Sequence, residues 1–250
     1  MRTVVVFAAL VLPACQFEVT GLTIPETDFA LGGGADLDGR DGAPAQDLSA
    51  DQAMPPGPDM AMPSQFLMGQ VLPPPAAIVV LTTEGTQDWA HYGLSSTLDF
   101  NHRALGGTRI PNFEKLGTPP LGRLTSHPVG FTWTDGTPTL AATDTQAVVY
   151  IEELGNGFRW LIACEGVQRV ARFYLGGYRA RGRLDARFND GTHTYSDSSQ
   201  IDANAEFYAV YRIDYRCTGV KSLEVSWRVG EDFSSGGNMA DVRVASVTLQ

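Results

Sequence analysis

Two short segments bring together the side-chain types that proteins use to recognise sugars. The candidate residues are Asp88, Trp89, His91 and Tyr92 in the first segment, and Trp133 and Asp135 in the second. An aromatic plane matches the apolar C–H face of a sugar ring, while carboxylates and imidazoles exchange hydrogen bonds with its hydroxyls. The sequence therefore predicts a carbohydrate-binding site here. It leaves one alternative open, in which the tryptophans pack in a core, Asp88 caps a turn and Asp135 lies in one.

The sequence gives little support for an enzymatic function. The histidines show none of the spacings typical of metal-dependent enzymes; they are His91, His102, His127 and His193. The chain also lacks a G-x-S-x-G nucleophile elbow and a glycine-rich phosphate loop. A carboxylate pair for glycoside hydrolysis has no sequence signature, so a glycan hydrolase stays as the least favoured alternative. We therefore expect a protein that is not an enzyme and has no catalytic residues.

The charge argues against a nucleic-acid partner. The formal net charge is −10, so the chain has no general basicity with which to bind phosphates. Residues 16–75 carry much of this charge, with nine acidic residues and a single base, Arg40.

The three cysteines are too few for a dense disulfide scaffold or a four-cysteine zinc site.

The N-terminus resembles a bacterial lipoprotein signal. Arg2 precedes an apolar run from Val4 to Leu12, which is too short to span a membrane. The run ends in Leu12-Pro13-Ala14-Cys15, which resembles the lipobox. This resemblance implies a signal peptide over 1–14 and acyl chains such as palmitate on Cys15. Because Gln16 follows, it also implies a lipid anchor in the outer membrane of a Gram-negative bacterium, facing the periplasm or the outside. An ordinary signal peptide with an incidental cysteine is the alternative.

Residues 15–75 are expected to form the lipidated cysteine and a disordered linker. Eight of the fifteen prolines fall between Pro44 and Pro75, among alanines, glycines and aspartates. Such a segment buries too little apolar surface to offset the conformational entropy lost on folding.

Residues 76–250 have the pattern of an all-β domain. Short apolar runs recur between glycine and proline turn signals, and none has the long apolar stripe of a helix. Apolar and charged residues alternate in several runs, as in 184–188 and 207–216. We therefore predict an antiparallel β-sandwich or jelly roll. The expected strands lie within 78–83, 107–116, 128–134, 146–152, 157–163, 167–176, 180–189, 205–216, 221–230 and 240–249, with a bulge between 244 and 247.

The two cysteines of this domain are expected to form a disulfide. Cys164 is in phase with Trp160 and Ile162, and Cys217 is in phase with Ile213 and Tyr215, so both should face the interior. An exported protein meets an oxidising compartment, which favours the bridge. Two buried free thiols are the alternative.

A structural calcium ion is a further hypothesis. β-Sandwich domains often hold their first and last strands together with such an ion, whose ligands are oxygen atoms. The candidate donors are Glu84, Asp88, Asn238 and Asp241. No spacing along the chain fixes this set.

Four motifs of the domain together resemble a module of secreted and surface bacterial proteins. They are LTTEGTQDWAHYG (81–93), GFTWTDGTP (130–138), GNGF (155–158) and YLGGYRARGRLDARFNDG (174–191). The resemblance implies a galactose-binding-like β-sandwich of the carbohydrate-binding-module type, with no established catalytic set. We therefore expect a surface lipoprotein that binds a carbohydrate or a cell-envelope polymer. The alternative is a structural or protein–protein interaction module of the envelope.

Overall fold

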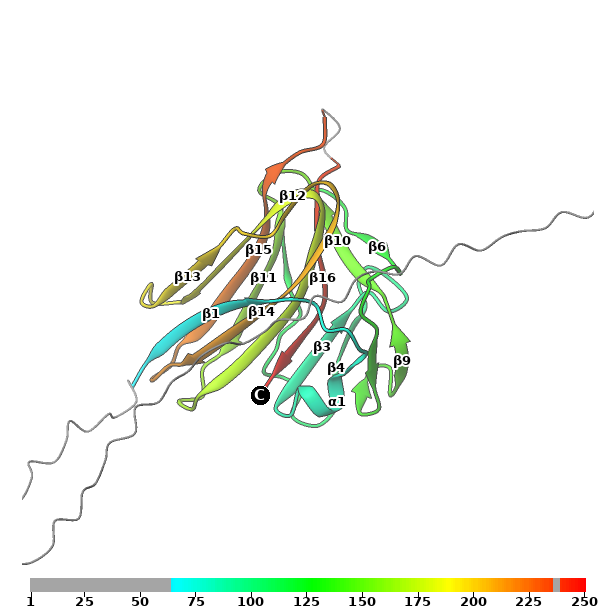
Figure 1. Ribbon diagram of the computed structural model, residues 1–250. Helices are drawn as coiled ribbons and strands as arrows, with labels where there is room; N and C mark the ends of the chain where they lie inside the picture. The colour runs from blue at the N-terminus through cyan, green and yellow to red at the C-terminus, as the bar shows by residue number, and fades with distance from the viewer. Residues whose placement is uncertain (1–63, 236–238) are drawn as a thin grey trace, which may run out of the picture. The chain divides into compact units, whose positions relative to one another are not determined.

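The computed structural model describes residues 64–235 and 239–250, and one long strand organises them (Figure 1). The first half of β12 (Arg169–Phe188) pairs with β14 (Ile201–Arg216) and β16 (Asp241–Leu249), and its second half pairs with β15 (Ser222–Asp232). The register shifts next to Arg179, which has a positive φ of 48°. The strand therefore passes from one layer of a sandwich to the other.

The two halves of β12 define two antiparallel layers. The first layer contains β14, the first half of β12 and β16, together with β1 (Phe66–Leu72), β3 (Asp88–Tyr92), β4 (Phe100–Arg103), β6 (Gly122–Leu124), β8 (Gly136–Thr137) and β10 (Val148–Glu152). The second layer contains the second half of β12 and β15, together with β5 (Glu114–Leu116), β11 (Gly157–Ala163) and β13 (Thr194–Asp197). The predicted all-β antiparallel sandwich is thus confirmed.

The core between these layers follows the period-two pattern of the sequence. Alternate residues of β12, β14 and β15, such as Phe173, Tyr211 and Trp227, are fully buried. The intervening residues, including Arg183, Arg187 and Arg212, stay partly exposed. The disulfide predicted between Cys164 and Cys217 is present and joins the ends of β11 and β14.

A small third layer covers part of the outer face of the first layer. It consists of β2 (Val79–Val80), the four-residue helix α1 (Leu81–Glu84), β7 (Phe131–Trp133) and β9 (Ala142–Thr145). Its apolar side chains form a second core cluster with residues of β3, β12, β14 and β16. Consequently β3 and the C-terminal half of β16 are covered on both faces, and every residue of both strands is buried. Burial on both faces replaces the usual alternation along these strands.

The structure corrects the predicted element boundaries in three places. The sheet begins at β1, inside the segment predicted as linker, because the run FLMGQVL pairs along its whole length with β14. The domain therefore starts before residue 76. The run 78–83 yields only the two-residue β2 before the chain turns into α1, and 107–116 is a strand only over Glu114–Leu116.

Other predictions lie beyond the part of the chain that the structure describes. The signal peptide, Cys15 and most of the predicted linker fall within residues 1–63. No helix among the described residues is long and apolar enough to cross a membrane.

The bulge predicted between residues 244 and 247 is confirmed by a register shift opposite Tyr174 and Leu175.

Candidate functional site

The predicted aromatic site is part of the core, so this prediction was wrong. Asp88, Trp89, His91, Tyr92 and Trp133 are all fully buried, with 0% of each exposed. The cause is the double covering of β3. Its odd-numbered side chains face the third layer, where Trp89 and His91 pack on Trp133 at ring-centroid distances of 5.3 and 5.0 Å. Its even-numbered Tyr92 faces the main core and accepts a hydrogen bond from Trp160 Nε1 at 2.9 Å.

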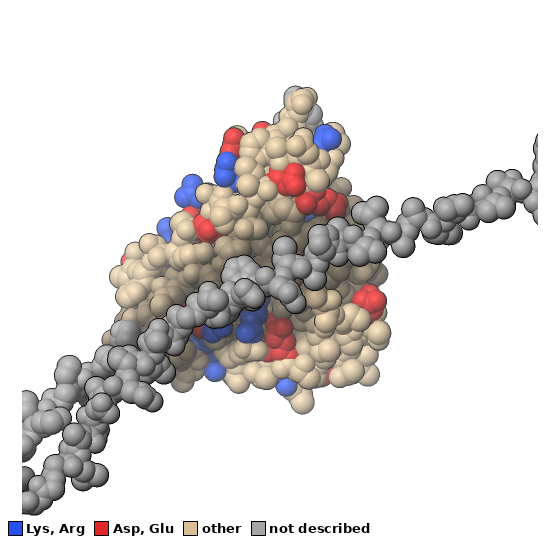
Figure 2. All heavy atoms as spheres, in the orientation of Figure 1, with Lys and Arg blue, Asp and Glu red and all other residues tan. Residues whose placement is uncertain are grey.

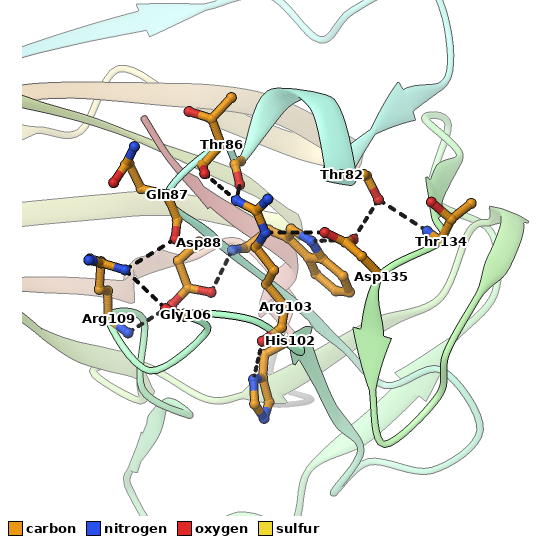
Figure 3. Close-up of polar contacts among 12 residues, drawn as sticks. Thr82, Thr86, Gln87, Asp88, His102, Arg103, Gly106, Arg109, Thr134 and Asp135 are labelled. Atoms are coloured by element: carbon orange, nitrogen blue, oxygen red, sulfur yellow. Dashed lines mark hydrogen bonds and ion pairs between the residues drawn. The ribbon is translucent and has the colours of Figure 1, made fainter.

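Asp88 has a structural role that its place beside Trp89 did not reveal. Its carboxylate accepts hydrogen bonds from the backbone N–H groups of Trp89 and Arg109 (Figure 3) and of Ile110, each at 2.8 Å. Burial raises its pKa, while these three hydrogen bonds act in the opposite direction. Asp88 thus fastens the loop before β5 to the edge of β3.

Asp135 links the third layer to the first. It accepts hydrogen bonds from Thr82 Oγ1 at 2.6 Å and Trp89 Nε1 at 3.1 Å, and its other oxygen pairs with Arg103 Nε at 3.1 Å (Figure 3). The guanidinium of Arg103 also donates to the carbonyl of Gly85 at 3.2 Å. The Trp133–Asp135 segment therefore connects the third layer to the first through hydrogen bonds and an ion pair. The structure supports the alternative in which the tryptophans are core residues. Asp135 lies between β7 and β8, whereas Asp88 begins β3 and accepts hydrogen bonds from the loop before β5.

The proposed calcium ligands do not come together. Leu249 pairs with Asp88 at one end of β16, whereas Asp241 starts the other end of this strand, about 25 Å away at the rise of a β-strand. Glu84 instead accepts hydrogen bonds from Tyr174 Oη at 2.8 Å and Thr248 Oγ1 at 2.7 Å. Asn238 lies outside the described residues. Within the described ranges, no group of three or more His, Cys, Asp or Glu side chains could hold a metal ion.

A different part of the first layer presents aromatic rings and carboxylates to solvent. There the tyrosines and glutamates on the outer face of β10, β12 and β14 are at least partly exposed, whereas Asp241 and Arg243 of β16 are buried. Cross-strand pairing arranges two rows there: Tyr150, Arg243, Gly176 and Tyr208 in one, and Glu152, Asp241, Tyr178 and Glu206 in the next. We call these eight residues the tyrosine platform. Together with Leu124 and Met239, members of the platform line a hollow of about 370 Å³.

Two tyrosines lie flat on the sheet because glycines stand opposite them. A Cβ atom at Gly122 would overlap the ring of Tyr150, and one at Gly176 would lie 2.7 Å from Cδ1 of Tyr208. The absence of a side chain at each glycine leaves room for the neighbouring ring to cover the backbone. Tyr150 is half-buried, so one side of its ring covers β6 while the ring stays accessible from solvent.

Arg243 holds the carboxylates of the platform in place. Its guanidinium donates to Asp241 at 2.8 and 3.1 Å, to Glu206 at 2.7 Å and to Tyr208 Oη at 3.0 Å. Burial raises the pKa of Asp241 to about 6 despite this partner. Burial also acts to raise the pKa of Glu206, but hydrogen bonds from Arg243 and Tyr208 outweigh it and lower that pKa. Arg243 is thus fully engaged beneath the surface.

Three polar groups of the platform stay available. The hydroxyls of Tyr150 and Tyr178 and the carboxylate of Glu152 form no side-chain hydrogen bond within the described part of the chain. The guanidinium carbons of Arg179 and Arg243 lie 5.1 and 5.8 Å from the centre of the Tyr178 ring, which holds this ring in place. In Figure 2, Asp and Glu side chains gather on the upper part of the visible face, near the upper ends of β10 and β12 in the view of Figure 1.

Sequence reasoning missed these residues. Tyr150 lies in a run that was predicted as a strand, and Tyr178 lies in one of the quoted motifs, but the nearby Glu152 and Arg179 do not by themselves mark a site. For Tyr150, the signal that could have found it is Gly122, which stands opposite its ring in the sheet. Tyr178 pairs with Glu206 and Asp241 and has no such signal. That signal depends on strand pairing, which the sequence does not display.

Comparisons with known proteins add little. No protein-family model matches the chain, and no curated protein matches it. Several solved structures match. One of them is described as the carbohydrate-binding module CBM36 in complex with calcium and xylotriose, and it is 8% identical over 56% of this chain and 100% of its own, with a TM-score of 0.29. A TM-score this low supports no inference about the site.

Proposed function

We propose that this protein binds carbohydrate without catalysing its cleavage, and that the tyrosine platform is the binding surface. A sugar ring would stack on Tyr150, while Glu152 and the hydroxyl of Tyr178 would exchange hydrogen bonds with its hydroxyl groups. The observation that carries the proposal is the flat, accessible ring of Tyr150 beside carboxylates in an open hollow. Leu124 and Met239 add apolar walls that suit the C–H faces of a sugar.

The engaged carboxylates support a binding role over catalysis. Glu206 and Asp241 both accept hydrogen bonds from Arg243, which hold the two carboxylates in place and restrict their movement. Glycoside hydrolysis needs one carboxyl group that gives up a proton and another that attacks or activates water. We therefore expect polysaccharides incubated with the protein to keep their length, as measured by chromatography of the products.

The N-terminal sequence supports a location for the protein in the cell envelope. We propose that acyl chains on Cys15 anchor the protein in the outer membrane of a Gram-negative bacterium, with residues up to β1 as the tether. Two or more acyl chains give durable attachment, whereas one is marginal. Labelled palmitate should enter the wild-type protein and not the Cys15→Ala variant. Equal labelling of both would contradict the anchor.

A glycan array followed by titration tests the binding proposal. The array identifies a polysaccharide that the full chain binds, and titration then compares Tyr150→Ala with Tyr195→Ala. Tyr195 is a matched control, because its ring also lies over a strand glycine, Gly69, but outside the platform. We expect Tyr150→Ala to weaken binding at least tenfold, equivalent to about 1.4 kcal/mol, and Tyr195→Ala to leave it unchanged.

Two results would contradict this assignment. Equal affinities of the two variants would show that the platform is not the binding surface. Failure to bind any polysaccharide, together with a protein partner recovered by cross-linking, would favour the envelope interaction module that the sequence left as an alternative.

A further inference from the structure

The outer face of the second layer carries a regular array of charges. Arginines of β12 and β11 pair with carboxylates on neighbouring strands, as in Arg181 with Glu231 at 2.9 Å and Arg187 with Glu224 at 3.2 Å. Cross-strand pairs of opposite charge stabilise a sheet, and like charges placed directly opposite destabilise it. Most of this array follows the stabilising rule.

One row breaks that rule. Arg183 of β12 stands directly opposite Arg228 of β15. Arg183 forms an ion pair with Asp185, in which Nε lies 2.9 Å from Oδ2 and Nη2 donates to Oδ1 at 3.1 Å. Arg228 donates only to the carbonyl of Gly155 at 3.2 Å and has no ion pair within the described ranges. The row therefore holds one guanidinium without a carboxylate, beside a second guanidinium that is 58% exposed.

The two arginines also border open space. They line two adjoining hollows of about 430 and 440 Å³, which share Arg183, Asp185 and Arg228. The first extends past Ser196 and Thr194 on β13, and the second extends past Gly155 and Gly230. Leu154 and Val229 also line that end. A shallow groove thus crosses β12 and β15, with the arginine pair at its middle.

We propose that this groove binds an acidic polysaccharide and that one carboxylate of its uronic-acid units lies between Arg183 and Arg228. Guanidinium groups offer parallel N–H donors that match the two oxygens of a carboxylate. A carboxylate there would offset the repulsion between the two arginines. The hydroxyls of Ser196, Thr194 and Ser226 and the carboxylate of Asp185 line the groove on both sides, where they suit sugar hydroxyls. Two joined hollows fit a linear polymer better than a single small anion.

This groove lies on the layer opposite the tyrosine platform. The two surfaces share no residue, so this proposal stands or falls independently of the proposed function. Together they would allow one domain to contact two polymers, or two segments of one polymer.

The test is a titration of the full chain with polygalacturonate, a carboxylate-bearing probe, against dextran as a neutral polymer. The variants are Arg228→Gln and Arg181→Gln. Each removes one positive charge from the second layer, but Arg181 is paired with Glu231 and lines neither hollow. We expect Arg228→Gln to weaken polygalacturonate binding at least tenfold, and Arg181→Gln to change it less than twofold. The wild-type affinity should fall as salt is added.

Several results would overturn the proposal. Binding of dextran as tight as that of polygalacturonate would show that charge is not recognised. Equal effects of the two variants would show that net charge alone matters. Inorganic phosphate or a DNA duplex that binds more tightly than polygalacturonate, with the same loss in Arg228→Gln, would replace the acidic polysaccharide with a phosphate-bearing ligand. The melting temperature of Arg228→Gln should equal or exceed that of the wild type, because the change removes a like-charge contact.

Discussion

Replacing His91 with phenylalanine should remove much of the acid sensitivity of the fold. His91 is fully buried between the first and third layers, and neither ring nitrogen has a hydrogen-bond partner within the described residues. Burial lowers its pKa to about 3 from the ordinary value of 6.5. The native state therefore keeps His91 neutral under conditions in which the unfolded chain takes up a proton.

The sign and size of the effect follow from this difference. Because the unfolded state binds the extra proton below pH 6.5, acid stabilises the unfolded state and the free energy of unfolding falls. Each full pH unit below that value removes about 1.4 kcal/mol, so a change from about pH 7 to about pH 5 removes roughly 2 kcal/mol. Solvent does not screen this effect, because none of the His91 side chain is exposed.

Urea unfolding of the wild type and of His91→Phe at these two pH values measures the effect. Phenylalanine has no ionisable group and can pack against Phe131 and Trp133 as the imidazole does. The control is His193→Asn, because His193 is exposed and its φ of 51° is one that asparagine tolerates.

The loss of stability between the two pH values should be about 2 kcal/mol smaller in His91→Phe than in the wild type, and the control should follow the wild type. His127, whose pKa burial also lowers, to about 4, should leave a residual pH dependence in both. Identical pH dependence of His91→Phe and the wild type would refute the reasoning, because it would mean that His91 titrates equally in the folded and unfolded states.

Three further predictions concern stability and the platform. Replacing Cys164 and Cys217 with alanine opens a bridge that spans 53 residues of sequence, and should lower the free energy of unfolding by about 4 kcal/mol, measured in urea; an unchanged midpoint would contradict this. Trp133→Ala should cost roughly 3–5 kcal/mol by leaving a cavity in the third layer, yet preserve glycan affinity at temperatures where the variant is folded; a selective loss of binding would restore Trp133 as a ligand contact. Gly122→Val should displace the ring of Tyr150 and weaken glycan binding as much as Tyr150→Ala does; wild-type affinity would show that the flat ring is not required.

The sequence predicted the parts of the fold that depend on local pattern. Alternation along β12 and β14 identified which side chains face the core, as for Leu184 and Tyr211, and placed both cysteines toward the interior. These inferences succeeded because one face of each strand meets the core and the other meets solvent. Period-two patterning then reports the environment directly.

The same logic failed where a third layer intervenes. Trp89 and His91 lie on the outer face of β3 and would be exposed in a two-layer sandwich, but β7 and α1 cover them. Nothing in the local sequence shows that a segment some forty residues later returns to cover this face. The aromatic and acidic cluster therefore looked like a binding site, although it is a structural joint.

The tyrosine platform was missed for a related reason. Its rows are assembled by pairing between β10, β16, β12 and β14, which lie far apart in the chain. Glu152 and Glu206, for example, occupy one row only because both strands align on β16 and β12. Residue chemistry could be predicted from the sequence, but the cross-strand neighbours could not.

The most direct test of the account is to locate a bound glycan on the molecule by NMR. Backbone amides of the isotope-labelled full chain would be followed while the polysaccharide selected on the array is added. The account predicts shift changes concentrated at residues 122–124, 150–152 and 241–243, with the amides of β3 and β7 unaffected. Shift changes confined to β3, β7 and the loop around Asp135 would contradict it, because they would return the binding surface to residues that the structure buries.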